Sequence, residues 1–81
     1  MIKIEKIANT CNGCPSQWEG ETEDGKDVYV RYRHGVLRVD VDGETKYSCV
    51  HPKHCSGDGV MNYDELKLNT YVLFRFPEEE S

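Results

Sequence analysis

The chain has 81 residues, of which 37% are hydrophobic, and a net charge of −5. A chain of this length forms one domain and buries only about 60–65% of the surface that its unfolded form exposes, so its core is marginal. The acidic balance argues against a protein that binds nucleic acid through an excess of Lys and Arg. No apolar run approaches the roughly 20 residues of a membrane-spanning helix.

We assign residues 1–77 to a single small domain and residues 78–81 to a solvated acidic tail. The first ten residues, MIKIEKIANT, lack the apolar stretch of about 7–15 residues found in secretory signals. With Met1 as the natural start, we therefore expect a cytoplasmic protein, and structural disulfides are disfavoured in that compartment.

The sequence predicts a mainly β fold. Isoleucines interleaved with Lys and Glu indicate a short first strand from Ile2 to near Ala8, and residues 9–15 read as a turn. The segment from Gln17 to Cys49 reads as a three-stranded antiparallel meander. Dipeptides that contain glycine mark its turns: Asp24-Gly25, His34-Gly35 and Asp42-Gly43.

The middle hairpin has a register that the hydrophobic pattern specifies. A two-residue loop at His34-Gly35 places three apolar pairs on one face: Tyr32 with Leu37, Val30 with Val39 and Val28 with Val41. A slip of one residue would bury the arginines instead. Residues of the flanking strands are expected on the same buried face: Trp18, Gly20, Thr22, Tyr47 and Cys49.

A short helix is predicted near the C-terminus. Asn62 and Glu65 have the N-cap and N3 spacing of a helix start, and the helix is expected from Tyr63 to Leu68. Residues 70–76 (TYVLFRF) are predicted to return as a strand with three apolar residues on one face: Val72, Phe74 and Phe76. The expected fold is thus a small antiparallel β-meander with one short helix.

Four cysteines in so short a chain suggest a staple. Cys11-Asn-Gly-Cys14 is a CxxC in a turn, and the segment CVHPKHC supplies Cys49 and Cys55, with His54 as a substitute ligand. Zinc takes four tetrahedral sulfur or nitrogen ligands, so we predict a structural zinc ion held by the four thiolates. Two disulfides in an exported protein, unpartnered thiols and a redox CxxC are the alternatives.

Residues 56–66 resemble the second half of an EF-hand calcium loop. Asp58, Gly59 and Glu65 fall at the fifth, sixth and twelfth positions of such a loop. The first and third positions are His54 and Ser56 rather than acidic residues. We therefore favour a turn followed by a capped helix, which needs the same glycine and glutamate for local reasons.

The solvent side of the meander carries Tyr29, Arg31, Arg33 and Arg38, and His34 at the hairpin tip extends this set. Such a surface is either an ordinary mixed-charge face, neutralised by Asp40 and Glu19, or a recognition patch for a phosphate or an acidic partner. No Ser or Cys is tied to a His and an orienting carboxylate by any pattern in the chain, so we expect no enzyme.

The stretch IANTCNGCPSQWEGETEDGKDVYVRYRHGVLRV and the later MNYDELK resemble small uncharacterised proteins encoded by actinobacteria and their phages. Those proteins begin with a similar ANTCN-x-CPSQWEG run, followed by a Tyr-Arg-Tyr-Arg strand. The resemblance covers about half of the chain and does not extend to CVHPKHC. It implies a phage origin and an intracellular role, and it brings no mechanism.

These observations predict a non-enzymatic, zinc-stabilised binding module that contacts another protein, and the resemblance implies that this partner is a host protein of a phage. The alternatives are a redox-active CxxC protein, in which Cys11 and Cys14 do chemistry, and a nucleic-acid-binding domain of the zinc-ribbon kind. Metal content and thiol titration separate the first two. Affinity for an oligonucleotide that falls steeply with salt would indicate the third.

Overall fold

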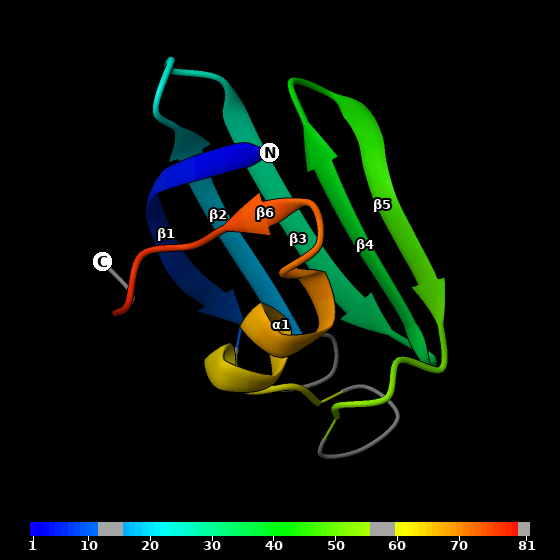
Figure 1. The fold of residues 1–81 in the computed structure, drawn as a ribbon. Coiled ribbons are helices and arrows are strands. Elements are labelled where there is room, and N and C mark those ends of the chain that lie inside the picture. Colours follow the sequence, from blue (N-terminus) through cyan, green and yellow to red (C-terminus); the bar gives the residue numbers. More distant parts are fainter. Residues whose placement is uncertain (12–15, 56–59, 80–81) are drawn as a thin grey trace.

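A computed structural model describes residues 1–11, 16–55 and 60–79. Within these residues the chain forms one six-stranded sheet and one helix (Figure 1). The sheet order is β5-β4-β3-β2-β1-β6; the first five strands pair antiparallel and β6 pairs parallel to β1. The element bounds are β1 Ile2–Cys11, β2 Ser16–Thr22, β3 Asp27–Arg33, β4 Val36–Val41, β5 Glu44–Val50, α1 Tyr63–Thr70 and β6 Phe74–Arg75. The prediction of a mainly β fold with one short helix near the C-terminus is confirmed.

The register of the β3–β4 hairpin is the predicted one. Val28, Val30 and Tyr32 lie opposite Val41, Val39 and Leu37, and all six side chains are buried. Three turns separate four strands between Ser16 and Val50, so the expectation of a three-stranded meander is wrong. The β3–β4 loop uses left-handed backbone at both positions, with φ of 52° at His34 and 75° at Gly35. Such φ values suit the primed turns that match the twist of paired strands.

The core lies between the concave face of the sheet and α1, which crosses that face (Figure 1). Trp18 and Val30 from the sheet and Leu66 from the helix are at most 1% exposed. Tyr47 packs against this core as expected, and Cys49 is half-buried. Burial of one face of the sheet leaves its other, convex face in solvent, and that face positions the site described below.

The first strand is longer than the sequence indicates. It extends past Ala8 to Cys11, and its pairing with β2 shifts register between Ile4 and Lys6 and again between Asn9 and Cys11. Its last residues show no apolar alternation, yet Asn9 pairs with Trp18 and Cys11 pairs with Gln17 of β2. Pairing with an existing strand therefore decides where β1 ends, and the predicted end near Ala8 is wrong.

The C-terminal strand is shorter than predicted. Asn62 and Glu65 form the expected capping box, but α1 continues to Thr70, whose Oγ1 donates to the Leu66 carbonyl at 2.7 Å. Residues 71–73 turn the chain back toward β1, so Val72 is 59% exposed rather than aligned with Phe74 and Phe76. Only Phe74–Arg75 pair with β1. The end of the helix and the turn after it thus occupy most of the segment that was predicted as a strand.

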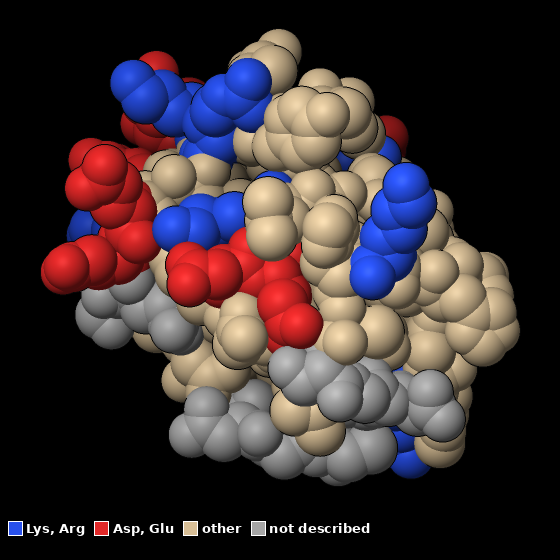
Figure 2. Space-filling view, turned by 60° about the horizontal axis from the view of Figure 1, so that its bottom comes forward, with Lys and Arg blue, Asp and Glu red and all other residues tan. Residues whose placement is uncertain are grey.

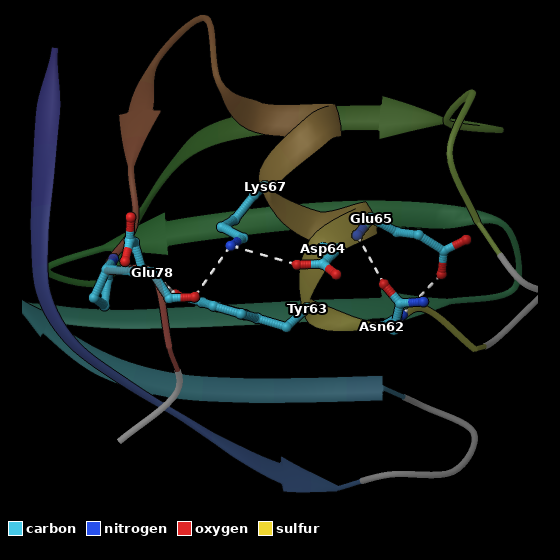
Figure 3. A network of polar contacts seen from close by, with 7 residues as sticks. Asn62, Tyr63, Asp64, Glu65, Lys67 and Glu78 are labelled. Carbon is cyan, nitrogen blue, oxygen red and sulfur yellow. Dashed lines mark hydrogen bonds and ion pairs between the residues drawn. The ribbon is translucent and has the colours of Figure 1, made fainter.

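The start of the C-terminal tail is held against α1 (Figure 3). The Tyr63 hydroxyl donates to the Pro77 carbonyl, and Lys67 Nζ donates to the Glu78 carbonyl at 3.2 Å. Lys67 also lies 3.4 Å from the Asp64 carboxylate. The helix therefore fixes the backbone of the chain as far as Glu78.

Candidate functional site

Three arginines meet on the convex face of the sheet. Arg31 and Arg33 alternate along β3 with the buried residues of that strand, and Arg38 does the same on β4. Arg31 lies directly opposite Arg38, as the predicted register requires. A shallow hollow of about 140 Å³ is lined by five residues from the hairpin: Arg31, Arg33, His34, Val36 and Arg38. The sequence analysis identified all of these except Val36, which is one-third exposed at the start of β4.

The positive charges at this hollow are incompletely neutralised. Arg38 Nε lies 3.4 Å from the Asp40 carboxylate, and Arg33 Nε donates to His34 Nε2 at 3.1 Å. Within the part of the chain that the structure describes, neither Arg31 nor Arg33 forms an ion pair, and the buried Arg31 Nε has no hydrogen-bond acceptor. Directly opposed like charges destabilise a sheet, and a buried donor without a partner costs about 1–3 kcal/mol. Within the described chain, the hollow therefore lacks a negatively charged hydrogen-bond acceptor for Arg31 and Arg33.

The tip of the hairpin is fixed from a distant segment. His51, just after β5, donates its backbone N–H to the Gly35 carbonyl at 2.6 Å. A Cβ on Gly35 would lie 3.1 Å from His51 Nδ1, so the imidazole packs closely over this glycine. Arg33 and His34, which precede Gly35, are thereby attached to a tip whose backbone is held in place. The sequence analysis assigned His51 no role and missed this anchoring contact.

The convex face changes sign along β3. Tyr29 lies outside the arginine hollow and borders a second depression toward the start of β3. Acidic side chains surround that depression together with Lys6: Glu19, Glu21 and Asp27. The expected set of Tyr29 with three arginines is therefore divided, and Asp40 pairs with Arg38 rather than with Arg31. The face presents a basic end and an acidic end.

A further acidic region lies on the helix side of the molecule. Asp64 at the start of α1 and Glu78 and Glu79 in the tail line one depression with Asn62 and Tyr63. Figure 2 shows Asp and Glu gathered on one side of a view that includes this region. The acidic residues responsible for the net charge are thus partly separated from the arginine hollow, which lies on the convex face of the sheet.

The predicted zinc ligands are only partly described. Cys49 is half-buried in β5, and Cys55 is exposed with its Sγ 3.7 Å from the Pro52 carbonyl oxygen. Cys11 is the last residue of β1, whereas its side chain and all of Cys14 lie outside the described residues. No group of three or more metal-ligating side chains occurs among the residues that are described. The four-cysteine zinc site therefore stays a prediction.

The sheet places Cys49 and Cys11 at the same end but far apart along it. Cys49 lies opposite Leu37, Leu37 opposite Tyr32 and Tyr32 opposite Ser16. Cys11 lies opposite Gln17, the neighbour of Ser16. Four strand spacings of about 4.8 Å separate the two cysteines along the curved sheet, whereas two thiolates on one zinc lie about 4 Å apart. This arrangement disfavours Cys49 as a ligand that shares an ion with Cys11.

Two described parts of the segment after β5 are attached to the rest of the fold. The Asn69 side chain holds the segment at His54, donating to the His54 carbonyl and accepting from the His54 N–H. Met61 N then donates to Ser16 Oγ at 3.0 Å, at the start of β2 and beside the end of β1. Cys55 directly follows His54 and lies outside the strands, so the strand spacing that separates Cys49 from Cys11 does not apply to it.

The half-formed calcium loop is also only partly described, since Ser56, Asp58 and Gly59 lie outside the described residues. Glu65 is within them, and its carboxylate accepts from the Asn62 N–H at 2.9 Å in the capping box. That local role is the one favoured from the sequence.

Comparison of the chain with protein-family models, with curated proteins and with solved structures gave no match in any of the three. No helix among the described residues is long and apolar enough to cross a membrane.

Proposed function

We propose that the protein is a non-enzymatic binding module that uses the arginine hollow to hold an acidic segment of another protein. The main support is that Arg31 and Arg33 line one hollow with Arg38 and form no ion pair within the described chain. Guanidinium groups are planar forks that match carboxylates in pairs. An acidic partner would supply the charge and the hydrogen-bond acceptors that the hollow lacks.

The acidic end of the convex face supports a protein partner over a nucleic acid. Asp27 lies on β3 with Arg31 and Arg33, and Glu19 and Glu21 lie on the neighbouring strand β2. A phosphodiester backbone that followed the face would meet these carboxylates and be repelled. A protein segment can carry acidic residues at one end and basic or neutral ones at the other, and such complementarity fixes its orientation. The resemblance to phage proteins makes a host protein the partner that we propose.

We also propose that a zinc ion supports the fold, with Cys11 and Cys14 joined by Cys55. A small domain gains stability from such a staple because the binding free energy of the metal adds to the free energy of folding. The redox alternative predicts two free and reactive thiols at Cys11 and Cys14. Thiol titration of the native protein, before and after addition of a chelator, distinguishes protected from free thiols.

The binding proposal is tested by titrating the isotopically labelled protein with a decamer of glutamate while recording backbone amide signals. We expect shifts at Arg31, Arg33 and Arg38, loss of these shifts in Arg33→Glu, and no change in Arg75→Glu. Arg75 is the one arginine outside the hollow, and its guanidinium donates to the Tyr71 carbonyl instead. An equal loss in both variants, or binding of a thymidine decamer as tight as that of the glutamate decamer, would contradict the proposal.

A further inference from the structure

The net charge of the arginine hollow indicates which kind of anion it would bind. Three arginines line it, Arg31, Arg33 and Arg38, and the carboxylate of Asp40 lies 3.4 Å from Arg38 Nε. Three positive charges and one negative charge leave an excess of two. The His34 Nε2 accepts a hydrogen bond from Arg33 Nε. One carboxylate ligand would neutralise half of the excess, whereas one dianion would neutralise all of it.

The donors come from two neighbouring strands and converge on one small volume. Arg31 and Arg38 are directly opposed in the sheet, with Cβ atoms expected about 5 Å apart. Arg33 is two residues along the same face and is attached to the anchored hairpin tip. A planar carboxylate satisfies one guanidinium fork well. Acceptor oxygens in a tetrahedral arrangement can engage forks that approach from several directions.

The size of the hollow agrees with a compact ligand. Its volume of about 140 Å³ is several times the share of a single water in the liquid, about 30 Å³. This is room for the five heavy atoms of a phosphate group. Val36 contributes an apolar wall next to the guanidinium groups, and lowering the local exposure to water strengthens charge-assisted hydrogen bonds.

We propose that the arginine hollow is a binding site for one phosphate group, carried either on a side chain of the acidic partner or by free inorganic phosphate. A phosphomonoester bears about −1.5 to −2 charges near neutral pH and presents three acceptor oxygens. This matches the excess of two positive charges and supplies acceptor oxygens to the side chain of Arg31, whose Nε has no hydrogen-bond partner in the described chain. The inference rests on the proposed function, because it names the chemical group that the same face recognises.

The test is isothermal titration at constant ionic strength with inorganic phosphate, with acetate, and with two acidic peptides that differ only in one central residue, serine or phosphoserine. We expect saturable binding of phosphate, none of acetate at equal concentration, and binding of the phosphoserine peptide at least about tenfold tighter than that of the serine peptide. Tenfold corresponds to one additional charge-assisted hydrogen bond.

Variants that keep the charge test the geometry. Arg31→Lys retains a cation but loses the fork, so we expect phosphate affinity to fall about tenfold, and the same holds for Arg38→Lys. The matched control Arg75→Lys should leave affinity unchanged. Fluorescence of Trp18, the single tryptophan and 1% exposed, reports whether each variant is folded.

Two results would overturn the inference: phosphate binding no stronger than acetate binding, or Arg31→Lys and Arg38→Lys that are both folded and bind phosphate like the parent. If the serine peptide binds while phosphate does not, only the phosphate inference fails and the proposed function stands. If neither peptide binds but free phosphate does, the proposed function fails and the free ion is the ligand.

Discussion

Gly20 occupies a position in β2 where the neighbouring backbone leaves no room for a side chain. A Cβ there would lie 1.9 Å from the Lys6 carbonyl oxygen and 2.9 Å from Ile7 Cα, whereas ordinary contacts begin at 3.4 Å. In Gly20→Ala the backbone of β1 would have to move by about 1.5 Å, the difference between 3.4 and 1.9 Å. That movement weakens about two backbone hydrogen bonds at about 1 kcal/mol each. It also disturbs the packing of the fully buried Ile7, which costs about 1–2 kcal/mol more.

We therefore expect Gly20→Ala to lower the free energy of unfolding by about 3–4 kcal/mol, from a total that for 81 residues is about 4–12 kcal/mol. The assay is urea unfolding followed by Trp18 fluorescence. Gly25→Ala is the matched control, because a Cβ there meets nothing within 4 Å and is opposed only by a φ of +85°, a cost of about 1 kcal/mol. Equal unfolding midpoints for the two variants would refute the reasoning.

Three further predictions concern the helix, the edge of the core and the cysteines. Asn62→Ala removes the acceptor of the Glu65 N–H, so the free energy of unfolding should fall by about 1 kcal/mol in urea. Burial of the Tyr47 hydroxyl, and after it the neighbouring Cys49 thiol, raise the pKa of Tyr47 above 10.0. The contribution of Tyr47 to the free energy of unfolding is therefore present below pH 10 and is lost as the pH rises from 10 toward the pKa of Tyr47 in the folded protein. Urea midpoints at pH 9 and pH 11 should therefore differ less in Tyr47→Phe than in the parent, and an equal difference contradicts this. Elemental analysis should show that Cys55→Ser lowers bound zinc and Cys49→Ser does not; the reverse order would contradict the ligand assignment.

The β3–β4 hairpin was predictable because two kinds of local information agree there. Apolar residues alternate with arginines on both sides of His34-Gly35, and a two-residue loop permits one register that buries the apolar set. The capping box was predictable for the same reason, since Asn62 and Glu65 contact each other within one helical turn. Both features are determined by residues close in sequence.

The elements that sequence reasoning misjudged depend on distant partners. Residues 9–11 extend β1 because β2 pairs with them, and no pattern within those residues indicates it. The strand expected at 70–76 has a suitable local pattern, but α1 must end and reverse before β1 can be reached. Competition between a continuing helix and a strand is decided by tertiary contacts.

The candidate site shows the same division. The register predicted that Arg31 would oppose Arg38. It could not show that Asp40 pairs with Arg38, that Tyr29 lies outside the hollow, or that His51 closes over Gly35. The first two features depend on the directions of side chains. The third depends on a contact with His51, which follows Gly35 by 16 residues in the sequence.

We propose that the three arginines of the convex face form one anion site. Because the chain has four arginines, nitrogen–proton spectra of their Nε–H groups can follow each of them while inorganic phosphate is added at constant ionic strength. We expect the signals of Arg31, Arg33 and Arg38 to move together and saturate, while that of Arg75 stays in place. Equal, unsaturated drift of all four signals would show that the three arginines do not act as one site.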